Sequence, residues 1–132
     1  MPSDGRDTKP RYPVPPLACD AHCHVFGPAD RFPYAATRTY TPEDKPKEVL
    51  AALHRRLGLG RAVIVQASCH GTDNRAMVDA LRLAPARYRG VAMIDDATSD
   101  ADLRDMDEAG VRGIRFNFIK ALGGGPDMAL VR

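Results

Sequence analysis

Four short apolar segments, separated by amphipathic stretches, set the pattern of this chain. The apolar segments are residues 17–26, 61–67, 90–94 and 111–119. Their length and β-branched content predict strands, and the run from 61 to 67 is typical of a strand buried on both faces. Between them, apolar residues recur at helical spacing. The order of elements therefore predicts a parallel α/β sheet with right-handed crossovers.

The three predicted helices end at glycine or proline, at Gly58, Pro85 and Gly110. The first helix has its apolar positions at 49, 50, 53 and 57, which leaves His54 on a face that we expect to be solvated. In the third, over residues 100–109, Leu103 and Met106 are expected to point inward. Residues 27–45 contain three prolines, at 28, 33 and 42, and are predicted to form a long loop.

The first 16 residues differ from the rest. Prolines at 2, 10, 13, 15 and 16 remove backbone donors and disfavour helix. We therefore expect residues 1–16 to be a disordered, proline-rich tail and residues 17–132 to form one domain.

Charge and composition argue against some classes of binding partner. Nineteen Lys and Arg residues and seventeen Asp and Glu residues are interspersed and leave a net charge of +2. This pattern argues against a nucleic-acid or membrane-surface partner. The chain has no apolar run near the length of a membrane span, no signal-peptide pattern, and three cysteines that fit reduced thiols better than disulfides. A cytoplasmic location is expected.

The main candidate for chemistry is the segment Asp20-Ala21-His22-Cys23-His24 at the end of the first predicted strand. Strand alternation predicts that Asp20, His22 and His24 share one face, with the imidazoles about 7 Å apart. Two imidazoles at that spacing can converge on one ion or one substrate atom. Two hydrogen-bonded structural histidines are the alternative.

The alternation of elements leaves two folds open, a closed barrel and an open doubly wound sheet such as a flavodoxin-like binding domain. The open sheet usually carries a glycine-rich phosphate loop after its first strand. Here that position reads His-Val-Phe-Gly-Pro, over residues 24–28. Catalytic residues of barrels lie at the carboxyl ends of strands, where the two histidines are predicted to be.

Residues 20–28 resemble the opening motif of the amidohydrolase superfamily. More narrowly, they resemble its 2-pyrone-4,6-dicarboxylate lactonase branch, whose relatives act on sulfomuconolactone and sugar lactones. The likeness continues in order through residues 40–42, 65–68, 71–74 and 110–117, and it covers about residues 17–120. It implies that residues 17–132 form the N-terminal half, about four βα units, of a TIM-type (β/α)8 barrel.

The resemblance also implies roles for single residues. His22 and His24 would be catalytic, either as ligands of a divalent metal such as zinc or manganese, or without a metal as in the pyrone lactonases. Tyr40, Ser68 and Arg115 match positions that contact the substrate's carboxylates or lactone ring. The implied activity is hydrolysis of a small carboxylated lactone or a related ring ester.

Two departures from the family pattern matter. The family often has an arginine shortly after the fourth strand, where this chain has Lys120 and Ala121, so a pyrone dicarboxylate is matched less well. The chain also stops after its fourth predicted strand, and the family's late catalytic aspartate has no match in it. The alternative expectation is therefore a truncated, non-catalytic product, or a half-barrel that binds a partner or self-associates.

Two weaker hypotheses concern the cysteines. Cys69 and His70 are adjacent, and adjacent residues on a strand point to opposite faces, which disfavours a direct dyad. Cys19 and Cys23 could join the two histidines of the motif in a small zinc site, although the usual spacing of zinc ligands is missing.

Overall fold

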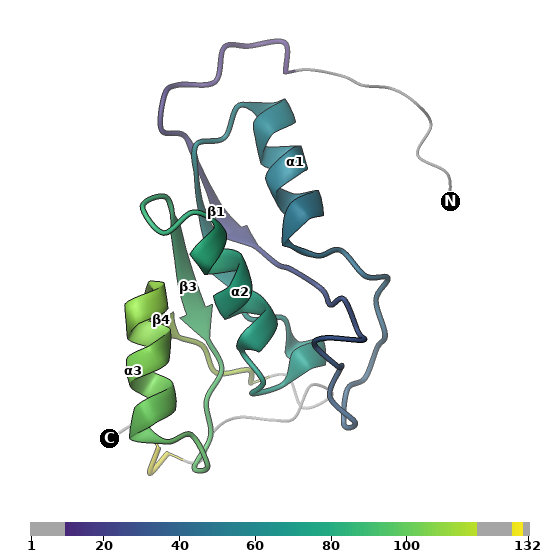
Figure 1. Cartoon of the computed structure of the whole chain (residues 1–132), viewed down its shortest axis with the longest axis vertical. Helices are drawn as coiled ribbons and strands as arrows, with labels where there is room; N and C mark the ends of the chain where they lie inside the picture. The colour runs from purple at the N-terminus through teal and green to yellow at the C-terminus, as the bar shows by residue number, and fades with distance from the viewer. Residues whose placement is uncertain (1–9, 119–127, 131–132) are drawn as a thin grey trace.

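The structure, a computed structural model, describes residues 10–118 and 128–130. It contains one parallel sheet with the strand order β1-β2-β3-β4. The strands are β1 (Cys19–Cys23), β2 (Arg61–Val65), β3 (Tyr88–Ala92) and β4 (Val111–Ile114). The connections contain the helices α1 (Lys47–Leu57), α2 (Arg75–Leu83) and α3 (Asp100–Ala109), and a 3₁₀ turn, η1 (Ser68–His70), follows β2 (Figure 1). The predicted α/β order is confirmed.

All three helices cover the same face of the sheet. The strands are parallel and adjacent in sequence order, so crossovers of one hand place every helix on one side. Figure 1 shows α1, α2 and α3 on the near side of the strands. A doubly wound sheet carries helices on both faces, so this single layer favours the barrel over the flavodoxin-like alternative. We call the face of the sheet away from the helices the inner face.

Strand β1 carries one extra residue relative to β2. Asp20 pairs with Ala62 and Cys23 pairs with Ile64, so two residues of β1 stand opposite one residue of β2. Paired residues in neighbouring strands point to the same side, and Asp20 and Cys23 therefore both face the helices. The two histidines of the motif face the inner side. The prediction that Asp20 shares their face is wrong, because it assumed unbroken alternation.

The hydrophobic core lies between the sheet and the helices. Ile64 of β2 and Leu81 of α2 are 0% exposed, and Met77 of α2 is 1% exposed. Gly90 of β3 is part of this packing, because a Cβ at that position would lie 2.7 Å from Leu81 Cδ1. The close approach of α2 to β3 thus depends on the missing side chain.

Local chemistry sets the ends of the helices. Helix α1 ends at Gly58 with φ 75°, and α3 ends at Gly110 with φ 108°, both in the left-handed region that favours glycine. Ser99 caps α3: its Oγ accepts from the Asp102 N–H at 3.1 Å, and Asp102 Oδ2 accepts from the Ser99 N–H at 3.0 Å. Hydrogen bonds from Ser99 also hold the pKa of Asp102 below its ordinary value.

All four predicted strands extend beyond the observed ones at their carboxyl ends, and β3, predicted over residues 90–94, is Tyr88–Ala92. The strand predicted over residues 17–26 is β1 of five residues, and β2 ends at Val65 instead of residue 67. Strand β4 ends at Ile114, whereas the prediction ran to residue 119, which lies outside the described residues. The apolar pattern continues because loop residues are buried too, such as Val25 at 3% and Ala67 at 2% exposure.

Two predicted helix faces are corrected. In α1 the buried residues include Leu50 and His54, whereas Leu53 is 37% exposed. The expectation that His54 is solvated is therefore wrong, since the residue is only 2% exposed. In α3, Met106 is buried as predicted, but Leu103 is 39% exposed.

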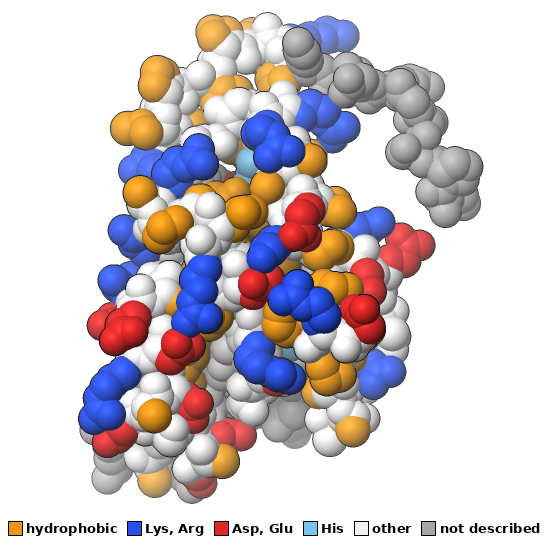
Figure 2. Space-filling view, in the orientation of Figure 1, with side chains coloured by type: hydrophobic (Ala, Val, Ile, Leu, Met, Phe, Trp, Pro, Cys, Tyr) orange, Lys and Arg blue, Asp and Glu red, His pale blue; other side chains and the backbone are white. Residues whose placement is uncertain are grey.

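The helix-bearing surface mixes charges of both signs. Figure 2 shows Lys and Arg side chains interspersed with Asp and Glu side chains over this face. Lys47 of α1 pairs with Asp79 of α2 at 2.8 Å, and Arg82 of α2 pairs with Asp105 of α3 at 2.6 Å. Such surface pairs each stabilise the fold by little. Within the described residues, no helix is long and apolar enough to cross a membrane.

Candidate functional site

The carboxyl end of β1 brings His22 and His24 together. Their rings meet edge to face with centroids 5.1 Å apart. His24 Nδ1 lies 2.8 Å from the carbonyl oxygen of Val65. A carbonyl can only accept, so Nδ1 carries the proton and Nε2 of the neutral ring keeps its lone pair. His22 is exposed and His24 half-buried, so the pair can offer nitrogens to one ion or one ligand.

Arg115 follows β4 directly and reaches the end of β2. Its Nη1 donates to the Gln66 carbonyl at 3.2 Å, and its backbone N–H donates to the Ala92 carbonyl at 2.8 Å. His24 and Arg115 are thus held at the consecutive carbonyls of Val65 and Gln66. A guanidinium has five N–H donors, and this side-chain bond occupies one of them.

Tyr40 and Ser68 form a second pair at the same edge of the sheet. Their hydroxyl oxygens are 3.4 Å apart, and they line a cavity of about 130 Å³ together with Arg38 and Met93. Ser68 was predicted to end the second strand, but it begins η1, because β2 ends three residues earlier. It lies two residues after Gln66, where the Arg115 side chain is bonded.

His70 is a structural residue. Its Nε2 accepts from the Gly27 N–H at 3.1 Å, and its Nδ1 donates to the Pro33 carbonyl at 3.3 Å. Both ring nitrogens are therefore used, and the ring is 2% exposed. This bonding fixes the loop after β1 against η1 and gives no support to a dyad with Cys69.

Two buried amides, which the sequence analysis did not single out, brace the loops beside these residues. Gln66 donates to the Gly71 and Asp73 carbonyls at 2.9 and 2.8 Å. Asn74 donates to the Met93 carbonyl at 2.8 Å and accepts from the Met93 N–H at 3.1 Å. A polar residue at the end of an apolar strand, as in Val-Ile-Val-Gln, is the signal that could have found Gln66.

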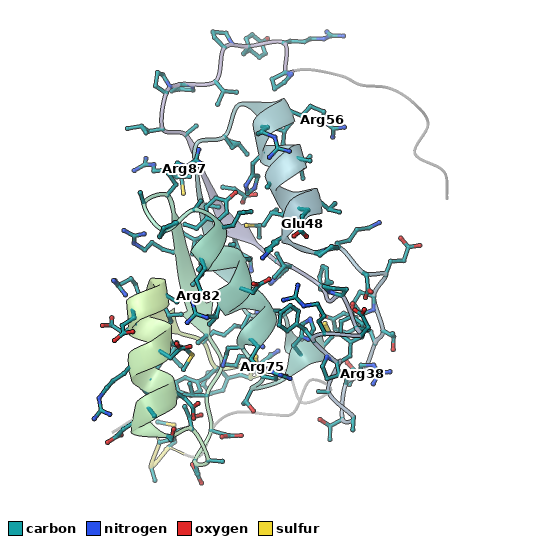
Figure 3. All side chains as sticks on the ribbon, in the orientation of Figure 1. Arg38, Glu48, Arg56, Arg75, Arg82 and Arg87 are labelled. Atoms are coloured by element: carbon teal, nitrogen blue, oxygen red, sulfur yellow. The ribbon has the colours of Figure 1, made fainter. Side chains whose placement is uncertain are left out.

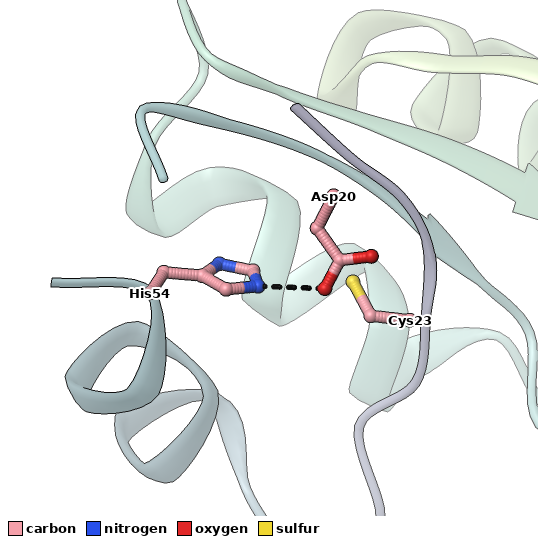
Figure 4. Close-up of side chains that lie close together, drawn as sticks. All are labelled: Asp20, Cys23 and His54. Atoms are coloured by element: carbon pink, nitrogen blue, oxygen red, sulfur yellow. Dashed lines mark hydrogen bonds and ion pairs between the residues drawn. The ribbon is translucent and has the colours of Figure 1, made fainter. Parts of the chain in front are cut away.

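A second cluster lies on the helix side of β1 and consists of Asp20, Cys23 and His54 (Figure 4). His54 Nε2 donates to Asp20 Oδ2 at 3.1 Å, while Asp20 Oδ1 accepts from the His22 N–H at 3.2 Å. The Cys23 thiol donates to the Val63 carbonyl at 3.5 Å. Burial, and then the charge of Asp20, raise the pKa of Cys23 to about 12.

This arrangement does not support the weaker zinc hypothesis that joined both cysteines of β1 to the histidine pair. The extra residue in β1 turns Cys23 toward the helices and the histidines toward the inner face. Cys19 is exposed at the start of the strand. The four side chains therefore do not form one cluster.

A cavity of about 570 Å³ lies between α2 and α3, away from the histidine pair. Its lining includes Arg75 and Arg82, which both project from α2 (Figure 3). Arg82 pairs with Asp105 at 2.6 Å and Arg75 with Asp73 at 2.8 Å. Hydrogen bonds from Arg75 lower the pKa of Asp73. Both α2 arginines are neutralised in this way and Arg31 stacks over the Phe32 ring at 5.0 Å, so we assign the cavity no ligand.

Comparison with known proteins identifies the family. A family model described as Amidohydrolase matches residues 19–132. The chain is 54% identical over 115 residues to a 2-pyrone-4,6-dicarboxylate hydrolase from Comamonas testosteroni. It is 42% identical over 114 residues to a 4-sulfomuconolactone hydrolase from Rhizobium radiobacter. These alignments cover 87% and 86% of this chain but 38% of each relative.

The fold is shared as well. A crystal structure from Acinetobacter baumannii, described as a probable 2-pyrone-4,6-dicarboxylic acid hydrolase with citric acid bound, superposes with a TM-score of 0.68 at 27% identity. The match covers 76% of this chain and 38% of that one. The chain thus spans well under half the length of the proteins it resembles. It belongs to the amidohydrolase family and carries the N-terminal part of that family's barrel.

Proposed function

We propose that the whole protein hydrolyses a lactone or related ring ester that carries an anionic group. This chain would supply the part of the site that binds the anion and polarises the ester carbonyl. The observation that carries the proposal is the placement of His24 and Arg115 at consecutive carbonyls of β2. The named relatives support it, since one acts on a pyrone dicarboxylate and the other on a sulfonated lactone.

Each side chain has a distinct task in this proposal. The Arg115 guanidinium suits a carboxylate, because its planar fork offers parallel N–H donors. Tyr40 and Ser68 offer hydroxyl donors to the lactone ring or to a second anionic group. His22 would lie against the reacting carbonyl as a hydrogen-bond donor, and a donor bond that strengthens as negative charge develops lowers the barrier to attack by water. His24 presents the Nε2 lone pair there and would polarise the carbonyl through a bound cation.

The histidine pair also fits a divalent metal. His24 holds its Nε2 lone pair free of the Val65 bond, and His22 lies beside it at the exposed end of the strand. A zinc or manganese ion held by His22 and His24 would act as a Lewis acid toward the carbonyl. Two imidazoles are fewer than the three protein ligands usual for catalytic zinc, so a complete metal centre needs a further ligand.

The partner we propose is a small molecule. The mixed charges over the helix-bearing face offer no single-sign surface for a nucleic acid there (Figure 2). The thiols of Cys19, Cys23 and Cys69 are free, which fits a reducing compartment. We therefore keep the cytoplasm as the proposed location.

Binding of 2-pyrone-4,6-dicarboxylate to the purified chain tests this function. Isothermal titration calorimetry is expected to show saturable binding that weakens about tenfold or more in Arg115→Gln, because a charge-assisted hydrogen bond is lost. Arg112→Gln is the matched control, since Arg112 lies in β4, is exposed, and bonds Asp107 at 2.9 Å. Its affinity should equal that of the wild type.

The same titration separates this function from the non-catalytic alternative. A half-barrel without a ligand site predicts no saturable binding, and that result would contradict the proposal, as would equal weakening in both variants. Hydrolysis by this chain is expected at trace rates only. The family's catalytic aspartate has no match among its residues, and general-base catalysis contributes roughly 10²–10⁴-fold.

A further inference from the structure

We propose that Asp20, Cys23 and His54 bind a zinc ion on the helix side of β1, separate from the histidine pair. A carboxylate oxygen, a sulfur and an imidazole nitrogen are the donors that zinc favours in proteins. They come from β1 and α1, and the three ligand atoms all lie within 4.8 Å of one another (Figure 4). The bound ion would fasten α1 to the strand that carries the histidines.

The three ligand atoms need a small adjustment to reach coordination distances. Zinc lies about 2.0–2.2 Å from nitrogen and oxygen ligands and about 2.3 Å from sulfur, so ligand atoms around a tetrahedral ion are about 3.3–3.8 Å apart. His54 Nε2 and Asp20 Oδ2 are already 3.1 Å apart. The widest separation must close by roughly 1 Å, which a turn of the Cys23 side chain away from Val63 can supply.

The burial of His54 favours metal binding by its imidazole. Its side chain is 3% exposed, and among the described residues Asp20 supplies its hydrogen bond while Nδ1 has no partner. One hydrogen bond compensates poorly for burying an imidazole. A coordination bond through Nε2 would stabilise the ring in this position more strongly.

Charge and access also fit a dication. Zinc with one thiolate, one carboxylate and one neutral imidazole has no net charge, which suits a site covered by a helix. The Asp20 side chain is 29% exposed, which leaves an approach for the ion and for a water molecule as fourth ligand. A metal ion can therefore enter and leave the site past the Asp20 carboxylate.

Cobalt(II) alone, added to the reduced and chelator-treated chain, tests the site. A thiolate bound to cobalt gives a near-ultraviolet charge-transfer absorption, which imidazole and carboxylate ligands do not. We expect this absorption to saturate at one equivalent, to survive in the His22→Ala/His24→Ala double variant, and to disappear in Cys23→Ser. Cys19→Ser is the matched control, because Cys19 is an exposed thiol of the same strand.

A second variant guards against a folding defect. His54→Gln keeps the approximate size and polarity of the side chain, and circular dichroism can verify its fold. It is expected to bind cobalt about tenfold more weakly or worse, because one of three protein ligands is lost. In the His22→Ala/His24→Ala background, zinc should raise the melting temperature of the chain, and adding Cys23→Ser should remove that rise.

Several results would overturn the proposal. A wild-type chain without the charge-transfer absorption has no thiolate–metal site. Absorption that persists in Cys23→Ser, or that is lost in Cys19→Ser, assigns the metal to another thiol. Loss in the His22→Ala/His24→Ala variant assigns it to the histidine pair. None of these results depends on lactone binding, so this inference and the proposed function fail separately.

Discussion

The Nδ1 atom of His24 donates to the Val65 carbonyl, so the ring presents Nε2 to the inner face. We predict that the neutral ring of His24 is the Nδ1-protonated tautomer, whereas the Nε2-protonated form is commoner for a free imidazole. Long-range ¹H–¹⁵N correlation spectra at a pH where the ring is neutral measure this directly. A His24 spectrum with Nε2 protonated would mean that the Val65 bond is not formed in solution.

Asp20→Ala should destabilise the fold. The change removes the acceptor for buried His54 and for the His22 N–H, and an unsatisfied buried donor costs about 1–3 kcal/mol. Urea unfolding in the presence of a chelator measures the loss without a contribution from metal. Asp30→Ala, at an exposed loop position, is the control and should change the free energy of unfolding by less than about 0.5 kcal/mol. Equal losses in the two variants would show that the Asp20–His54 bond contributes nothing.

Gly90→Ala should destabilise the fold through steric overlap. The new Cβ would lie 2.7 Å from Leu81 Cδ1 and 3.1 Å from Val111 Cγ2. Overpacking of this kind costs about 1–3 kcal/mol. Gly113→Ala is the control, because its nearest neighbour, Val91 Cγ2, is 3.6 Å away, an ordinary contact. Thermal unfolding of both variants checks the prediction, and an unchanged Gly90→Ala melting temperature contradicts the close approach of α2 to β3.

Cys23 should resist alkylation in the metal-free chain. Burial and the Asp20 charge raise its pKa to about 12, so at pH 8.5 its thiolate fraction is roughly a thousandfold below that of an ordinary thiol. Iodoacetamide labelling followed by peptide mass spectrometry should show exposed Cys19 reacting first. Labelling of Cys23 at the rate of Cys19 would contradict this environment.

The same raised pKa affects stability at alkaline pH. The folded chain holds the Cys23 proton more tightly than the unfolded chain, whose thiol titrates near 9. This contribution to stability is fully present below pH 9 and is lost as the pH rises toward 12. We predict that Cys23→Ser reduces the steepness of the loss of stability between these values, measured by urea unfolding at several pH values.

The order of elements and the helix ends could be predicted because their signals are local. Gly58 and Gly110 stand where the helices end, and a run of β-branched residues marks β2. The direction of side chains in β1 could not be predicted, because an extra residue is visible only against the pairing partner. The prediction that His54 is solvated failed for a similar reason, because its hydrogen-bond partner, Asp20, lies 34 positions away in another element.

The likeness to known hydrolases supplied the candidate residues, and the structure shows which hydrogen bonds hold them. The motifs shared with the family pointed to His24 and Arg115, but they did not indicate that both side chains bond the end of β2. Hydrogen bonds to main-chain carbonyls leave no trace in the identity of the accepting residue. These hydrogen bonds to main-chain carbonyls therefore cannot be predicted from residue types alone.

The extra residue in β1 places the side chains of residues 20–24 on two sides of the sheet with separate roles. On the helix side, Asp20 bonds His54 of α1 and Cys23 lies beside it; on the inner side, the rings of His22 and His24 are free of that packing. Deleting Ala21 would restore regular pairing with β2 and would keep Asp20 and Cys23 on the helix side and both imidazoles on the inner side. Substitutions at 22 and 24 can therefore alter the chemistry of the inner face while the contacts of β1 with α1 are conserved.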